Sequence, residues 1–214
     1  MNWMLPSWRG ATLALVVLVT LSVASPRTSA YGGLGNFELS REEVALLPEF
    51  CRHTQLIIVR HGSASAQREW IERVGPAFLA MHHYCVAVVA YVRSHRHSNS
   101  KTDRIAYLNF AEGNQTYVVD RIGPDFALRA EIYYRRGQAR SGLGKLPEAL
   151  SDLEKAVESD PKHVRANHEL SQVLLALGER ERASKVLRAA LERVPGNRLL
   201  ESSLEQVERS PKKR

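Results

Sequence analysis

Apolar and polar residues follow one another along the back part of the chain in the pattern of paired amphipathic helices, and that pattern occurs twice. The residues that recur at a spacing of 34 are Ala149, Leu153, Ala156 and Pro161, which return as Ala183, Leu187, Ala190 and Pro195. Residues four and three apart lie on one helical face, and small residues there allow a second helix to approach closely. A fixed period of this length indicates a repeat architecture. We therefore predict two antiparallel helix pairs, over residues 130–163 and 164–197.

The positions between these faces predict where each helix ends. Gly144 and Gly178 stand where a first helix must stop and the chain reverse, a position that favours left-handed backbone geometry. Pro161 and Pro195 cannot continue the second helix and so end each repeat. An array of this kind needs about three repeats to bury a continuous core. We therefore expect the residues before position 130 to extend the stack.

The segments 143–149 and 156–161 resemble the tetratricopeptide repeat, a likeness that covers 68 of the 214 residues. Further positions agree with the family: Tyr133 and Gly137 are its aromatic and small positions in the first copy, and Leu170 and Ser171 its leucine and small positions in the second. Arg136, Arg140 and Asn167 depart from the family pattern. The resemblance, to the exported bacterial type, implies an all-α superhelical stack of antiparallel helix pairs.

The resemblance also implies a binding surface on the concave side, which the first helix of each pair lines. The positions that it assigns to partner binding are Glu131, Tyr134, Gln138, Ser141, Arg165, His168, Gln172 and Leu175. Tyr134 and Arg165 are the strongest candidates because aromatic and arginine side chains dominate binding energy. The family members that grip a terminal carboxylate have lysine and asparagine at positions 134 and 138, so we do not expect that specialised role here. The implied function is a protein–protein interaction module that binds a protein or peptide.

The first 30 residues read as a secretory signal peptide. Arg9 gives a positive flank, residues 11–24 are uncharged and mostly apolar, and residues 28–30 form a small-x-small cleavage site. The 14-residue apolar run is shorter than the roughly 20 residues of a membrane span. A cut after Ala24, or an uncleaved anchor, are the alternatives. We expect a periplasmic or secreted protein, acting as a scaffold or assembly factor, without a stable membrane span after cleavage.

The front of the expected mature chain is irregular. Residues 31–66 read as a leader, a short helix that Ser40 and Glu43 begin as a capping box, and a loop. Residues 67–129 read as a degenerate helical pair that Gly75–Pro76 kinks or divides and that Gly113–Asn114 weakens. The expected apolar faces consist of Trp70, Val74, Phe78, Met81, Tyr84, Cys85, Val88, Val89 and Val92, then Ile105, Leu108, Ala111, Tyr117 and Val118. Residues 198–214 read as a capping helix and a basic tail.

Cys51 and Cys85 are the two cysteines of the chain. An oxidising compartment favours a disulfide between them, which would tie the short first helix to a longer one. The alternative is a metal or haem site with His53, His82 and His83. Neighbouring residues on a helix point about 100° apart, so both histidines of the pair cannot join Cys85 at one centre, and no haem-attachment motif is present. We therefore expect no metal and no cofactor.

The net charge indicates the class of partner, and one further motif raises the question of an enzyme. The formal net charge of +7 falls to +5 once Arg9 and Arg27 of the first 30 residues are removed, and no acid leaves with them. This excess favours an acidic partner protein, an anionic polymer or a membrane surface; we expect no nucleic acid, because aromatic interleaving is absent. Arg60-His61-Gly62 resembles the start of the histidine phosphatases, which need an α/β sheet that the helical pattern does not supply. We expect no enzyme.

Overall fold

The structure, a computed structural model, describes residues 37–54 and 64–209, and regular structure within them is helical throughout. The first elements are α1 (Arg41–Leu46), the 3-10 helix η1 (Glu49–His53), α3 (Ala64–Val74), the 3-10 helix η2 (Pro76–Ala80), α4 (Met81–Ser94) and α5 (Lys101–Val119). The repeat region then contains α6 (Arg129–Gly142), α7 (Leu146–Ser159), α8 (Val164–Ala176), α9 (Arg180–Arg193) and α10 (Arg198–Arg209). The predicted all-α class is confirmed.

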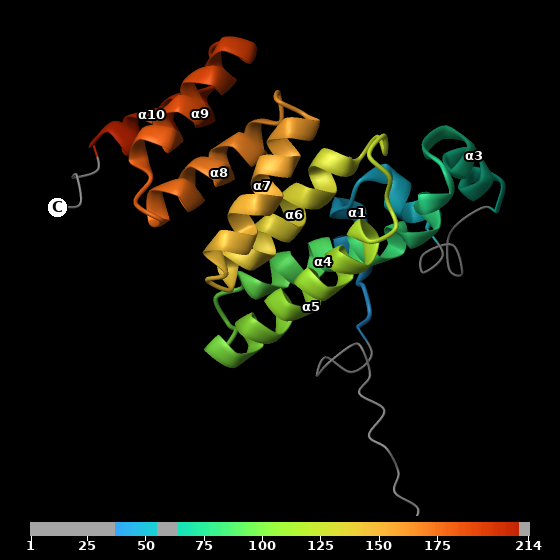
Figure 1. Cartoon of the computed structure of the whole chain (residues 1–214). Helices are drawn as coiled ribbons and strands as arrows, with labels where there is room; N and C mark the ends of the chain where they lie inside the picture. Colours follow the sequence, from blue (N-terminus) through green and yellow to red (C-terminus); the bar gives the residue numbers. More distant parts are fainter. Residues whose placement is uncertain (1–36, 55–63, 210–214) are drawn as a thin grey trace, which may run out of the picture.

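The long helices pack as antiparallel pairs, α4 with α5, α6 with α7 and α8 with α9, and the pairs follow one another in chain order (Figure 1). The second helix of each pair contacts the first helix of the next pair, and α10 packs against α8 and α9. The first helices also contact one another, α4 with α6, α6 with α8, and α8 with α10. These four helices therefore form one continuous surface, which we call the inner face. The stack has the architecture that the tetratricopeptide pattern predicts.

Small residues are placed between the helices of the two repeats as predicted. Ala149 and Ala183 are 0% exposed, and they belong to one apolar core that continues from α6 to α10. Gly144 and Gly178 have φ of 76° and 85°, in the left-handed region where a side chain is strained. The predicted reversals of the chain are therefore confirmed, and the second helices can lie close to the first.

The two arginines that depart from the family pattern pair with acidic residues; Arg136 is buried and Arg140 is half-buried. Arg136 and Arg140 of α6 both bind Asp152 of α7, which is 1% exposed. Arg140 and Lys145 also bind Glu112 of α5, at 3.1 and 2.6 Å. A charge network thus takes the place of apolar contacts at the crossing of α5, α6 and α7. The third departure, Asn167, donates from its side-chain amide to the carbonyls of Pro161 and His163 at the start of α8.

The front region contains three differences from the prediction. Gly75–Pro76 divides the helical pattern as expected, with φ of 92° at Gly75, but α3 already begins at Ala64, inside the expected loop. The expected weakness at Gly113–Asn114 is wrong, because Asn114 bonds to the carbonyl of Phe110 and to His83, and α5 runs through it unbroken. The expected burial of three apolar-face residues is also wrong: the exposed ones are Val92 (52%), Ile105 (42%) and Tyr117 (38%).

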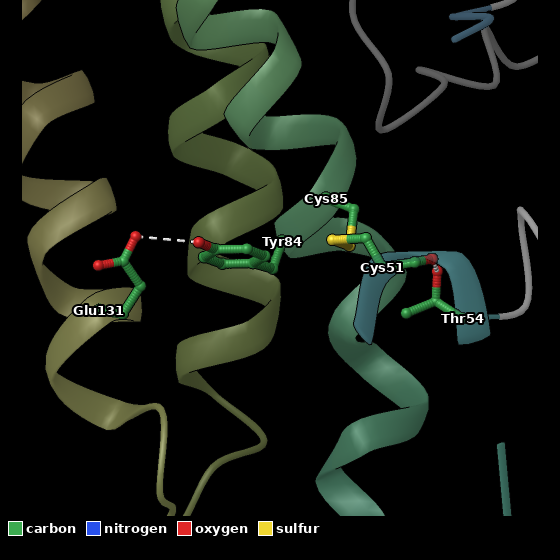
Figure 2. Close-up of a disulfide and its surroundings, with 5 residues drawn as sticks. All are labelled: Cys51, Thr54, Tyr84, Cys85 and Glu131. Atoms are coloured by element: carbon green, nitrogen blue, oxygen red, sulfur yellow. Dashed lines mark hydrogen bonds between the residues drawn. A yellow bond between two sulfur atoms is a disulfide. The ribbon is translucent and has the colours of Figure 1, made fainter. Parts of the chain in front are cut away.

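A disulfide joins Cys51 of η1 to Cys85 of α4, with Cα atoms 5.8 Å apart (Figure 2). The predicted capping box at the start of α1 is present, since Ser40 and Glu43 bond to each other's backbone N–H groups. Glu43 also binds Arg93 and Arg96 near the end of α4. The α1–η1 segment therefore lies antiparallel along α4 and closes the front end of the stack.

The back end of the stack is closed by α10, as predicted. Leu200 and Val207 are buried at 0% and 1% exposure, and Leu204 packs beside them. Arg180 of α9 donates to the carbonyl of Val207 over 2.7 Å, which satisfies an acceptor at the end of α10. Among the described residues, every helix is too short or too polar to span a lipid bilayer.

Candidate functional site

The best-defined polar arrangement on the inner face surrounds Glu131 of α6. Its carboxylate accepts hydrogen bonds from the Tyr84 hydroxyl of α4 (3.0 Å) and from Arg135 Nε of α6 (2.6 Å), and it lies 2.8 Å from His163 Nε2 at the start of α8. Figure 2 shows Tyr84 pointing toward Glu131, while the neighbouring Cys85 points toward η1. We call Tyr84, Glu131, Arg135 and His163 the Glu131 cluster. It connects three consecutive first helices and so fixes their spacing.

Electrostatics within the cluster favour the ionised carboxylate. Burial raises the pKa of Glu131, but the hydrogen bond to His163 and the charge and hydrogen bond of Arg135 outweigh it and lower the pKa to about 2. Burial, with the negative charge of Glu131 beside it, raises the pKa of the Tyr84 phenol well above its usual range. Tyr84 therefore stays protonated at any ordinary pH, and its hydroxyl donates a hydrogen bond to Glu131.

Two further tyrosines, Tyr134 of α6 and Tyr91 of α4, contribute to the inner face. Tyr134 is 3% exposed; its ring lies 5.0 Å from the His163 ring and 5.1 Å from the Arg135 guanidinium. Burial raises the pKa of Tyr134, and burial together with the charge of Glu169 raises that of Tyr91 to about 12. Both phenols are therefore neutral hydrogen-bonding groups. The negative charge of Glu169 on α8 contributes to both shifts of pKa.

The structure divides the eight predicted binding positions into a supporting and an accessible set. Tyr134 and Gln138 are buried, at 3% and 8% exposure, and belong to the support. Arg165 is exposed, whereas the remaining five are half-buried: Glu131, Ser141, His168, Gln172 and Leu175. Of the two strongest candidates, only Arg165 therefore presents a free surface to a partner.

Several of the half-buried positions are held by the neighbouring helix. His168 Nδ1 lies 2.7 Å from the Ser203 hydroxyl of α10, and Gln206 donates to Gln172 Oε1 over 3.4 Å. Leu175 packs against the core of the repeats. Contacts with α10 thus hold His168 and Gln172 in place on the C-terminal half of the inner face.

Sequence reasoning missed four residues of the inner face: Tyr84, Tyr91, Arg135 and Glu169. Tyr84 was assigned to an apolar face, although its hydroxyl crosses to α6. The role of Arg135 could have been predicted, because Glu131 precedes it by four residues, and a glutamate and an arginine at that spacing form a stabilising pair on a helix. The contacts of Tyr91 and Glu169 depend on helices that meet only in the fold, so the sequence alone offered no sign of them.

The rings of His82 and His83 lie 4.2 Å apart, but each ring bonds to a different partner. His83 Nδ1 lies 2.6 Å from Asn114 Oδ1, and His82 Nδ1 lies 2.9 Å from the carbonyl of Leu79. Within the described part of the chain, no group of three or more histidine, cysteine, aspartate or glutamate side chains could hold a metal ion, and both cysteines are in the disulfide. His61 of the phosphatase-like motif lies outside the described residues.

The inner face combines fixed polar groups with an accessible arginine and a carboxylate of opposite charge. Arg165 and Glu169 lie one helical turn apart on α8, while Arg135 and Glu131 lie one turn apart on α6. Such a surface can bind a peptide by hydrogen bonds and ion pairs at several points. The side chains of the Glu131 cluster are held by one another, so they lose little conformational entropy on binding.

Part of the chain is similar to known proteins. Residues 142–206 match the family model described as "Tetratricopeptide repeat". The structure is also similar to a solved structure described as "TPR2B-domain:pHsp70-complex of yeast Sti1", with 24% sequence identity, a TM-score of 0.44, and coverage of 57% of this chain and 95% of that one. The family match begins at the end of α6, contains α7, α8 and α9, and ends within α10. The family match therefore identifies tetratricopeptide repeats within residues 142–206.

Proposed function

We propose that this protein is an exported interaction module that binds a segment of a partner protein on its inner face, and that it serves as a scaffold or assembly factor for an envelope or secreted complex. The repeats themselves point to a non-catalytic protein–protein interaction module. The observation that carries the finer proposal is the continuous inner face, on which Arg165 is accessible beside the ordered Glu131 cluster. The expected signal peptide and the disulfide support export.

The chemistry of the face favours an extended peptide with both polar and charged groups. Neutral phenols, amides and paired charges alternate across α4, α6 and α8, so no single sign of charge dominates. A peptide backbone can exchange hydrogen bonds with the amides, and an acidic side chain can pair with Arg165. The affinity would come from a few such anchors, with the rest of the face supplying complementarity.

Site-specific photo-crosslinking tests where a partner binds. A photoreactive amino acid at position 165 should crosslink one specific protein in the native host, whereas the same amino acid at Lys185, exposed on α9, should not. The captured partner can then be purified and its affinity measured. Arg165→Glu should weaken binding at least tenfold, and Lys185→Glu should leave it unchanged.

Two results would contradict the proposal. Equal crosslinking at positions 165 and 185 would show that the inner face is not the binding surface. Export is tested separately by the mass of the protein recovered from the native host, which should correspond to removal of residues 1–30. Recovery of the intact chain from the cytoplasm would contradict export without affecting the binding surface.

A further inference from the structure

A second recess lies away from the inner face, where η2 and the start of α4 meet the C-terminal end of α5. Its volume is about 430 Å³, within the range of ligand-binding pockets. It is lined by residues of η2, by His82 of α4, by Tyr117 of α5 and by Arg121 of the turn after α5; the residues of η2 are Pro76, Ala77, Leu79 and Ala80. We call this recess the Arg121 pocket. Its walls combine apolar side chains with His82, Tyr117 and Arg121, and none of the described residues that line it is acidic.

Arg121 is held at the pocket by Tyr117. Its guanidinium carbon lies 3.4 Å from the centre of the Tyr117 ring, and Nη1 donates to the Tyr117 carbonyl over 2.9 Å. In residues 37–54 and 64–209, no carboxylate forms an ion pair with Arg121. This contrasts with Arg93, Arg135, Arg136 and Arg140, each of which binds an acidic side chain. The remaining N–H groups of Arg121 are thus available for a carboxylate from outside the chain.

His82 adds a hydrogen-bond acceptor to the apolar wall. Its Nδ1 lies 2.9 Å from the Leu79 carbonyl, and since a carbonyl only accepts, this nitrogen carries the proton. Burial, followed by the charge of His83, lowers the pKa of His82, so the ring is neutral at pH 7 and Nε2 keeps its lone pair. The pocket therefore contains one cation, one neutral acceptor and an aliphatic surface.

The exposure of the rim indicates the kind of ligand. Leu79 is 44% exposed and Tyr117 38% exposed, although both are large apolar side chains. A small molecule usually has 70–90% of its surface buried in its site, which so open a recess does not provide. A chain segment of another protein can cover the exposed rim while one of its side chains enters the recess. The net positive charge of the protein favours an acidic segment.

We propose that the Arg121 pocket binds an acidic–aliphatic segment of a partner protein, with an aliphatic side chain against Leu79 and Ala77 and a neighbouring Asp or Glu carboxylate on Arg121. This surface is formed by η2, α5 and the start of α4, whereas the binding positions proposed on the inner face lie on α6 and α8. The two surfaces could therefore hold separate segments. The pocket proposal does not depend on binding at the inner face.

Fluorescence anisotropy tests the proposal with a defined probe, a fluorescein-labelled eight-residue peptide of alternating Leu and Asp, acetylated and amidated at its ends. The purified protein should bind it saturably, and a matched peptide with Asn in place of Asp should bind at least tenfold more weakly. Arg121→Gln should weaken binding of the Asp peptide at least tenfold. Arg104→Gln, an exposed arginine near the other end of α5, is the matched control and should have no effect.

Further variants distinguish binding at the Arg121 pocket from binding at the inner face. Leu79→Asp should also weaken binding at least tenfold, because it places a negative charge on the exposed rim, while Arg165→Glu should leave it unchanged. Circular dichroism should show native helicity for every variant, since these side chains are exposed. The absence of saturable binding, equal binding of the Asn peptide, or full binding by Arg121→Gln would each overturn the proposal. If Arg165→Glu lost binding of the Asp peptide while Arg121→Gln retained it, the peptide would instead bind on the inner face.

Discussion

Arg136 of α6 binds Asp152 of α7 through two parallel hydrogen bonds, Nε to Oδ2 at 2.8 Å and Nη2 to Oδ1 at 2.7 Å. Both residues are buried, at 7% and 1% exposure. Arg140 adds a third bond to the same carboxylate and extends the network to Glu112 of α5. Three helices of two neighbouring pairs thus share one buried set of charges at a place where the repeat usually has apolar residues.

Breaking this pair on one side should destabilise the protein strongly. Asp152→Ala leaves the Arg136 guanidinium buried without its counter-charge, and we expect the free energy of unfolding to fall by about 3–5 kcal/mol. The double variant Arg136→Met with Asp152→Leu replaces both charges by apolar groups and should be clearly more stable than Asp152→Ala. Urea denaturation followed by circular dichroism measures both. A double variant no more stable than the single one would show that the cost does not come from the unpaired charge.

Gly137 should not accept even a methyl group. A Cβ built there would lie 2.8 Å from Leu153 Cγ and 3.0 Å from Leu153 Cδ2, so Gly137→Ala should lower the free energy of unfolding by about 1–3 kcal/mol through overpacking. Gly113 is the matched control within α5, because its added Cβ would meet nothing within 4 Å. Gly113→Ala should therefore raise the free energy of unfolding by about 0.5–1 kcal/mol. Equal effects at the two glycines would contradict the close approach of α6 and α7.

The stability of the protein should decline in acid between about pH 5 and pH 2. The hydrogen bond from Arg93 lowers the pKa of Glu43 to about 2, and Glu131 also has a pKa of about 2. A carboxyl whose pKa is lower in the folded state than in the unfolded chain stabilises the fold above the unfolded value near 4.5, and this stabilisation is lost as the pH falls toward the folded value. Both groups therefore contribute to the same acidic transition.

Glu131→Gln isolates the contribution of the inner face. The variant should be less stable than the wild type at pH 7, and its loss of stability between pH 4.5 and pH 2 should be shallower by roughly 1 kcal/mol per pH unit. Glu158→Gln, at an exposed position of α7, is the control and should keep the wild-type slope. Urea denaturation at several pH values gives the slopes. An unchanged acid slope in Glu131→Gln would show that the cluster does not hold this carboxylate ionised.

The disulfide should stabilise the front of the stack more than the repeats. It closes a loop with a sequence separation of 34, for which loop-closure entropy gives about 3–4 kcal/mol. The variant Cys51→Ala with Cys85→Ala should lose about that amount, and hydrogen exchange should become faster in α1 and η1 than in α8 and α9. Adding a thiol reductant to the wild-type protein should reproduce this pattern. Uniform acceleration along the chain would contradict a local role.

The repeat region could be predicted because its information is local and periodic. Ala149 and Ala183 stand at equivalent helix crossings, and both are fully buried as their spacing required. Gly144 and Gly178 stand at turns whose backbone only glycine adopts readily, so their positions marked the reversals before the fold was known. The pairing of Cys51 with Cys85 was also accessible, because the chain has no other cysteine.

The candidate site was less predictable because its residues meet only after the helices pack. Arg136 was recognised as a departure from the family, but its partner Asp152 lies on the next helix and does not repeat. Tyr134 stood at a groove position by resemblance, yet its ring is buried beside His163 and supports the surface. Gly113–Asn114 led us to expect a weak point in α5, although the Asn114 side chain forms hydrogen bonds with the Phe110 carbonyl and with His83. Each error arose where a tertiary contact outweighed the local tendency.

The two ends of the stack are closed by different means. At the front, Cys51 is covalently joined to α4, and Glu43 adds ion pairs. At the back, α10 is held by apolar packing and by the bond from Arg180 to the Val207 carbonyl. Thermal or mechanical unravelling should consequently start from the C-terminal helix and progress backward, which gives the array a built-in direction of disassembly.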